Sequence, residues 1–141
     1  MTTIAITGIS GYLAKTVLPR LQTEPEIENI IGIGIAPLSG CSKKVTFYRG
    51  DVRDSQMARW LSGTDILLHL AFMVQEIHDK KKGREINVEG IKNVLKAAVK
   101  NDIRKIIYTS SVAAYGAHPD NTVGITEDFG INPPPFCRPA I

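Results

Sequence analysis

The hydrophobic residues of this chain change their spacing in a regular alternation, and this alternation constrains the fold more than any other feature. Short runs rich in β-branched residues, typical of strands buried on both faces, alternate with segments whose apolar residues recur every three or four positions, as in helices. We predict strands over 3–8, 29–35, 44–50, 65–71 and 105–111, and helices over 12–23, 54–63 and 85–102. This order predicts right-handed βαβ units on a parallel sheet.

Each long helix carries an apolar stripe that we expect to pack against the sheet. The predicted stripe of the first helix comprises Leu13, Ala14, Val17, Leu18 and Leu21, and that of the last comprises Ile91, Val94, Leu95 and Ala98. The middle helix places Met57, Trp60 and Leu61 at helical spacing before Gly63, which is suited to end a helix.

The alternation stops at residue 116. The remaining segment holds five of the eight prolines and shows no helical period. Proline fixes φ and removes a backbone donor, so we predict one folded domain over 1–116 and a proline-rich irregular tail over 117–141.

Composition excludes several classes of protein. The chain has 141 residues, of which 43% are hydrophobic, enough for one domain with a core. A net charge of +3 spread along the chain does not indicate nucleic-acid binding, and we interpret the basic run at 80–84 as a solvated surface. Cys41 and Cys137 form no metal-binding spacing, and no apolar run suits a membrane span. We therefore expect a cytoplasmic protein without a metal site.

Two glycines mark the junction of the first strand and the first helix. Free N–H groups and the positive end of the helix dipole meet at such a junction, and a phosphate binds there if the backbone can come close. Gly8 would permit the tight turn, Gly11 the approach of the phosphate, and Ala14 the close packing of helix on strand. The alternative is an ordinary turn that contains two glycines, but its position in a βαβ series favours a dinucleotide site.

Five segments in order resemble the extended branch of the short-chain dehydrogenase/reductase superfamily, the nucleotide-sugar epimerases and dehydratases. They are TGISGYLA (7–14), GDVRD (50–54), LLHLAF (67–72), NVEG (87–90) and YTSSVAAYG (108–116). The resemblance implies a Rossmann-type, doubly wound parallel sheet of about five strands in the order 3-2-1-4-5. It covers nearly the whole chain but only the N-terminal half of a family member, so we expect a fold truncated before the later strands.

The resemblance also implies a set of site residues. The first loop, with Gly8, Ser10, Gly11, Tyr12 and Leu13, would bind the phosphates of NAD or NADP; Asp51 and Val52 would lie near the adenine; Leu70, Ala71 and Phe72 would line the nicotinamide ribose; and Ser111 would be catalytic. Further partners implied are a nucleotide sugar and a second copy of the chain, since relatives often form homo-oligomers.

Two departures from the family pattern concern the cofactor. Gly34 stands where relatives usually carry an Asp for the adenosine ribose, so either NADP is accepted or ribose binding is simply weaker. Ser39, Lys43 and Lys44 are the only candidates that this alignment offers for a contact with a 2′-phosphate. Ile86 replaces a polar residue, and we interpret the neighbouring Asn87 as a structural residue at the helix entry.

A third departure concerns catalysis. The family uses a Tyr-x-x-x-Lys pair, which at a common spacing would fall on Phe136 and Ala140. Without this pair Ser111 cannot act as a base, so we expect no hydride transfer by the 141-residue chain. If turnover were observed, Tyr115 and His118 would be the first residues to test as a recruited base. A non-catalytic module that senses a dinucleotide is the alternative function, whereas a flavodoxin-like domain would need clustered carboxylates that the sequence lacks.

Overall fold

The computed structural model describes residues 1–73, 83–116, 118–119 and 121–131. The chain divides into two compact units, Met1–Tyr108 and Thr109–Ile141. Phe136 and Ala140 lie outside the described residues. The predicted division after residue 116 remains a proposal.

Within the described residues, the first unit holds a five-stranded parallel sheet in the order β3-β2-β1-β4-β5, which confirms the predicted order. Its strands are β1 (Thr2–Thr7), β2 (Ile27–Gly34), β3 (Val45–Arg49), β4 (Ile66–His69) and β5 (Lys105–Tyr108). Its helices are α1 (Tyr12–Thr23), α2 (Met57–Trp60), the π-helical turn η1 (Glu85–Glu89) and α4 (Gly90–Lys100).

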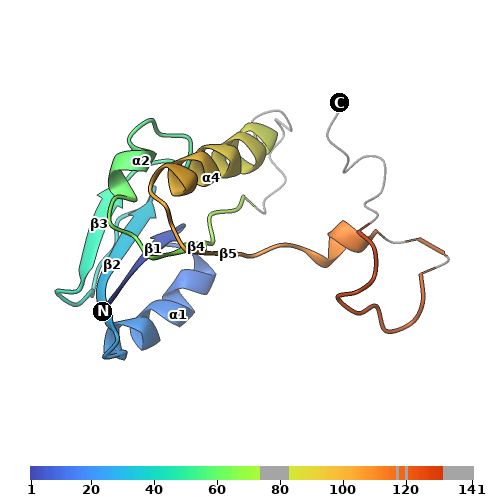
Figure 1. Cartoon of the computed structure of the whole chain (residues 1–141), viewed down its shortest axis with the longest axis horizontal. Coiled ribbons are helices and arrows are strands. Elements are labelled where there is room, and N and C mark those ends of the chain that lie inside the picture. Colours follow the sequence, from blue (N-terminus) through green and yellow to red (C-terminus); the bar gives the residue numbers. More distant parts are fainter. Residues whose placement is uncertain (74–82, 117, 120, 132–141) are drawn as a thin grey trace. The chain divides into compact units, whose positions relative to one another are not determined.

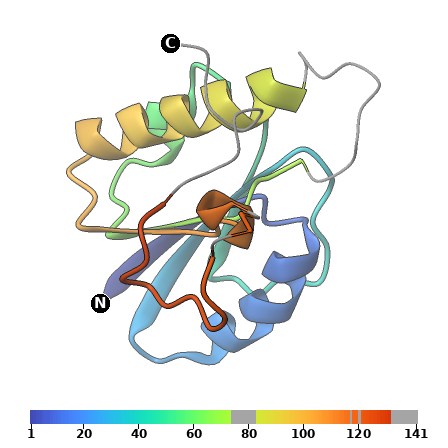
Figure 2. The ribbon, with the colours of Figure 1, turned by 90° about the vertical axis from the view of Figure 1, so that its right-hand side faces the viewer.

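Helices cover both faces of the sheet. Helix α1 lies on one face and helices α2 and α4 lie on the other, so that the sheet is the middle layer (Figure 1). Figure 2 shows the same layers from another side, with α4 and α1 on opposite sides of the strands. Strand β1 alternates accordingly: Ile4 and Ile6 pack in the cluster under α1, and Ala5 packs in the cluster under α2 and α4.

The predicted helix stripes are partly wrong. Leu13 is 47% exposed and Leu95 is 39% exposed, although both were expected to face the core. The buried residues of α1 are Ala14 and Leu18, and the buried residues of α4 include Ala97, which the prediction had left out. Small side chains allow a helix to approach a sheet closely, and this turns the neighbouring leucines toward solvent.

Helix lengths also differ from the prediction. The helix expected over 54–63 is a single turn, Met57–Trp60, because tight turns flank it on both sides: Met57 N–H donates to Asp54 O, and Ser62 N–H donates to Arg59 O. The helix expected over 85–102 begins as the π-turn η1 and ends at Lys100.

The second unit begins where β5 ends. Strand β5 stops at Tyr108, three residues before the predicted end, and a short 3-10 helix, η2 (Val112–Tyr115), follows. Ser111 caps this helix, since its Oγ accepts a hydrogen bond from Ala113 N–H at 3.2 Å. The rings of Tyr115 and Phe129 pack edge to face, with their centroids 6.4 Å apart.

Candidate functional site

The loop between β1 and α1 is fixed by its neighbours on both sides. Gly8 N–H donates to Ile33 O of β2 at 2.8 Å, and Leu70 N–H, just after β4, donates to Thr7 O at 3.0 Å. Gly8 has a φ of +75°, and a Cβ built on it would lie 2.7 Å from the backbone of Ala71. Glycine is therefore required at position 8 for two reasons: the left-handed conformation of the backbone and the close approach of two backbone segments.

Gly11 differs from Gly8 in its surroundings. It is exposed and extended, with φ −76° and ψ 170°, and stands at the N-cap of α1 without a side-chain cap. Its N–H donates to Gly8 O at 2.8 Å, which tightens the loop. Ala14 follows on the buried side and is 0% exposed, as its predicted packing role requires. The first N–H groups of α1 and its positive dipole end thus meet at a place where the backbone lies open, which suits a phosphate.

Large apolar side chains gather at the same edge of the sheet. Parallel strands bring their carboxyl ends together, and the large exposed apolar residues in the described segments after β1, β2 and β4 are Tyr12 (84% exposed), Leu13 (47%), Ile35 (66%) and Phe72 (53%). Gly8 meets Leu70 and Ala71, so the structure brings the first loop and the segment after β4 together. An edge with exposed apolar side chains beside a loop that suits a phosphate fits a ligand that has both phosphates and aromatic rings.

Asp51 and Val52 follow β3 at this edge, but each is already engaged. The Asp51 carboxylate accepts two hydrogen bonds from the Arg53 guanidinium, both of 2.9 Å, and these lower the pKa of Asp51. The Val52 side chain is buried in the core cluster with Val94 and packs against Gly90. The Val52 carbonyl also accepts a hydrogen bond from Asn93 Nδ2 at 2.8 Å, so both its side chain and its carbonyl already have partners in the protein.

A buried polar pair lies just below the edge. Thr7 Oγ1 and His69 Nδ1 are hydrogen-bonded at 2.6 Å, and His69 is 2% exposed. Burial lowers the pKa of His69 to about 4, so the ring is neutral at neutral pH. It also stacks on Tyr108, with ring centroids 5.6 Å apart. The Thr7–His69 hydrogen bond joins the ends of β1 and β4, and the stacking of His69 on Tyr108 joins β4 to β5. These contacts lie next to Gly8, where the loop begins.

Asn87 has the structural role that the sequence predicted. Its side chain is hydrogen-bonded to both backbone groups of Met73: Met73 N–H donates to Asn87 Oδ1 at 2.9 Å, and Asn87 Nδ2 donates to Met73 O at 3.1 Å. Asn87 thereby holds the segment after β4 against η1.

The surroundings of Gly34 at the end of β2 differ from the prediction, because Lys44, one of the predicted contacts for a 2′-phosphate, does not lie there. A Cβ built on Gly34 would lie 2.7 Å from Ser10 Oγ, and this hydroxyl donates to Ala36 O at 2.8 Å. Ser10 therefore occupies the space where a side chain at position 34 would stand. Lys44 cannot serve as a cation here, because it precedes β3 at the opposite edge of the sheet and its Nζ donates to Glu24 O.

Ser111 belongs to the second unit, where its Oγ caps η2 and its side chain is exposed. Its catalytic role remains a proposal. Among the described residues, no group of three His, Cys, Asp or Glu side chains could hold a metal ion. No helix in the described ranges has the length and apolar character needed to cross a membrane.

The comparisons with known proteins agree with this geometry. The NAD dependent epimerase/dehydratase family matches residues 4–139. The chain belongs to this family. The sheet order and the packed glycine loop described above are the features that the resemblance implied.

Particular relatives are matched over only part of their own length. UDP-glucose 4-epimerase of Halalkalibacterium halodurans is 29% identical over 119 residues, 80% of this chain and 36% of that protein. Human 3 beta-hydroxysteroid dehydrogenase type 7 is 30% identical over 121 residues, 79% of this chain and 33% of that protein. A solved short-chain dehydrogenase/reductase superfamily protein from Agrobacterium tumefaciens with bound NAD is 25% identical, with a TM-score of 0.79, and the match covers 94% of this chain and 39% of that one. The chain thus spans between a third and two fifths of these relatives.

Proposed function

We propose that this chain is the NAD(P)-binding part of an enzyme that epimerises or dehydrates a nucleotide-linked sugar. The observation that carries the proposal is the β1–α1 loop, where Gly8 is packed between two strands and the exposed Gly11 opens the N-terminus of α1. Family membership and the NAD-bound Agrobacterium protein support the cofactor, and the UDP-glucose 4-epimerase supports the sugar.

The described residues fit such a cofactor. A dinucleotide would place its pyrophosphate at Gly8, Ser10, Gly11 and the first N–H groups of α1, with Tyr12 and Leu13 beside it. The adenine would approach Asp51 and the Val52 backbone, and the nicotinamide ribose would lie along Leu70, Ala71 and Phe72. When bound, the cofactor supplies hydride transfer, and these residues bind and orient it.

Catalysis requires more than these residues. A sequence of 141 residues with no Tyr-x-x-x-Lys pair offers Ser111 to position a substrate hydroxyl but no matching base. The proposed role of the chain alone is therefore cofactor binding. Membership in an enzyme family does not favour the alternative of a purely sensing module. A homo-oligomeric state and a cytoplasmic location are parts of the same proposal.

A second candidate substrate follows from one relative. The likeness to human 3 beta-hydroxysteroid dehydrogenase type 7 favours a hydroxysteroid as the alcohol that is oxidised. Both candidate functions use the same proposed cofactor site at the carboxyl ends of the strands, and they differ in the substrate.

Turnover and binding assays separate these possibilities. We expect the chain to bind NAD⁺ or NADP⁺ in calorimetry and, with UDP-glucose present, to form neither the 4-epimer of the sugar nor reduced cofactor detectable at 340 nm. Reduction that depends on UDP-glucose and is lost in Ser111→Ala would contradict the assignment of binding alone. Reduction with a 3β-hydroxysteroid and not with the sugar would favour the second substrate. Failure to bind either cofactor would contradict the proposed function itself.

A further inference from the structure

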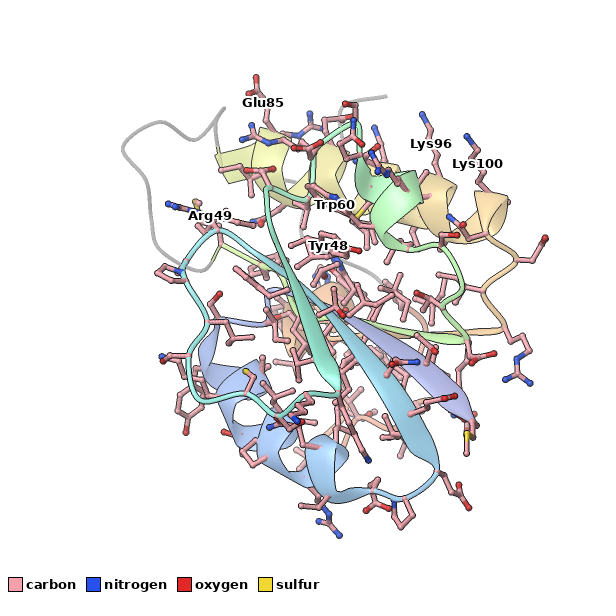
Figure 3. The ribbon with its side chains drawn as sticks, turned by 90° about the vertical axis from the view of Figure 1, so that its left-hand side faces the viewer. Tyr48, Arg49, Trp60, Glu85, Lys96 and Lys100 are labelled. Carbon is pink, nitrogen blue, oxygen red and sulfur yellow. The ribbon has the colours of Figure 1, made fainter. Side chains whose placement is uncertain are left out.

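Arg49 lies beside the position where an acidic residue is missing. Gly34 of β2 and Arg49 of β3 are direct partners in the parallel register, and both are the last residues of their strands. Arg49 Nε donates to Ile35 O at 3.2 Å, which holds the guanidinium next to the segment that follows β2. Figure 3 looks onto β3 and shows Arg49 at the end of this strand, beside the connection from β2.

The guanidinium of Arg49 is available to an external anion. Arg49 is exposed, and within the described residues it forms no salt bridge. The acid nearest in sequence, Asp51, is already bound by Arg53 through two hydrogen bonds of 2.9 Å. The segment 34–44 contains no Asp or Glu at all. Among the described residues, the cation at the end of β2 is therefore not paired with a carboxylate.

Ser10 hinders a single substitution that would place a carboxylate at position 34. Its Oγ fills the space in front of Gly34 and is held by Ala36 O at 2.8 Å, so a carboxylate at position 34 would first have to displace it. A carboxylate at the end of β2 accepts hydrogen bonds from the ribose hydroxyls of NAD and repels the 2′-phosphate of NADP. An arginine attracts that phosphate.

We infer that Arg49 binds the 2′-phosphate of NADP(H) and makes this chain prefer NADP(H) over NAD(H), an inference that rests on the proposed function. Arginine presents paired N–H donors to a phosphate, and such charge-assisted bonds are stronger than neutral ones. The sequence alone pointed to Ser39, Lys43 and Lys44, because the register that places Arg49 beside Gly34 is a property of the sheet.

Calorimetry with matched ligands tests the inference. The parent chain should bind NADP⁺ about tenfold or more tightly than NAD⁺, and 2′,5′-adenosine diphosphate more tightly than 5′-AMP by a similar factor. Arg49→Ala should weaken NADP⁺ binding by about tenfold or more and change NAD⁺ binding by less than about twofold. Arg49→Lys should retain part of the preference.

Arg20→Ala is the matched control, because it removes the same charge from the last turn of α1, at the far end of the helix from the loop. It should leave both affinities unchanged. The inference is wrong if NAD⁺ binds as tightly as NADP⁺, or if Arg49→Ala weakens both cofactors equally or neither. A folded parent that binds neither cofactor would contradict the proposed function as well, and this result is distinct from a lost preference.

Discussion

At the scale of single residues, two glycines of one loop have different physical roles. Gly8 cannot be replaced without strain, since its φ is +75° and a Cβ would meet the backbone of Ala71 at 2.7 Å. Gly11 has an ordinary φ of −76°, and its Cβ would meet only Gly8 O, at 3.0 Å. Gly8 is therefore required by the fold, whereas the fold does not require Gly11, whose role in our proposal is to let a ligand approach.

Gly8→Ala should lower the free energy of unfolding by at least about 2 kcal/mol, because it combines left-handed strain with a backbone clash. Gly11→Ala should lower it by only about 1 kcal/mol, since alanine is a poorer N-cap than glycine but position 11 adds no left-handed strain. Urea denaturation followed by circular dichroism measures both. Equal losses in the two variants would contradict the assignment.

The buried His69 gives the folding stability a pH dependence. Its pKa is about 4 in the folded chain and 6.5 for a solvated histidine in the unfolded chain, so between these values the unfolded chain binds a proton that the folded chain excludes. The free energy of unfolding therefore keeps its full contribution from neutral His69 above about pH 6.5 and falls by of order 3 kcal/mol as the pH decreases toward 4.

His69→Gln should remove most of this loss, because glutamine can still bond to Thr7 Oγ1 and does not titrate. Denaturation midpoints of the parent and the variant, compared at pH 7.5 and pH 5, measure the difference. An identical fall in stability in both proteins would show that His69 is not responsible.

At the scale of elements, the spacing of hydrophobic residues predicted the positions of strands and helices. It was less successful in predicting which residues these elements bury. The five strands followed from the alternation of period, since parallel strands buried on both faces leave a clear signal, whereas their order followed from the family resemblance. The orientation of α1 and α4 did not follow, because Leu13 and Leu95 satisfy a helical period as well as the alanines that are buried. The contact between Gly90 and Val52 decides how closely α4 approaches the end of β3, and no local pattern reveals it.

Gly90→Ala tests that contact. Alanine favours a helix by about 1 kcal/mol over glycine, but its Cβ would overlap Val52 Cγ2, and overpacking costs about 1–3 kcal/mol. We expect a net destabilisation of about 1 kcal/mol in the parent. In a Val52→Ala background the same substitution should instead be stabilising. A stabilising effect in both backgrounds, measured by urea denaturation, would show that α4 does not pack this closely.

At the scale of the whole molecule, the described sheet is bounded by two unlike edges. At β3, the Tyr48 ring stacks on the Trp60 ring of α2 with centroids 5.7 Å apart, and Figure 3 shows the two side chains close together. At β5, Ile106, Ile107 and Tyr108 are 38%, 43% and 45% exposed. The β1–α1 loop lies between these two edges, since β1 is the middle strand, and it was predictable because Gly8, Gly11 and Ala14 stand close together in the sequence. Arg49 was not, because its position depends on strand register.

A dinucleotide that binds at the β1–α1 loop, as we propose, should be excluded by Gly11→Val. Valine places a branched side chain where the pyrophosphate would lie, while the core beneath is untouched. Gly130→Val is the matched control, since a Cβ on Gly130 meets no atom within 4 Å.

Isothermal titration calorimetry of the three proteins with NAD⁺ and NADP⁺ is the deciding measurement. We expect Gly11→Val to weaken both cofactors by at least about tenfold and to remain folded by circular dichroism, with the control indistinguishable from the parent. Binding of both cofactors to Gly11→Val as tightly as to the parent would contradict the claim.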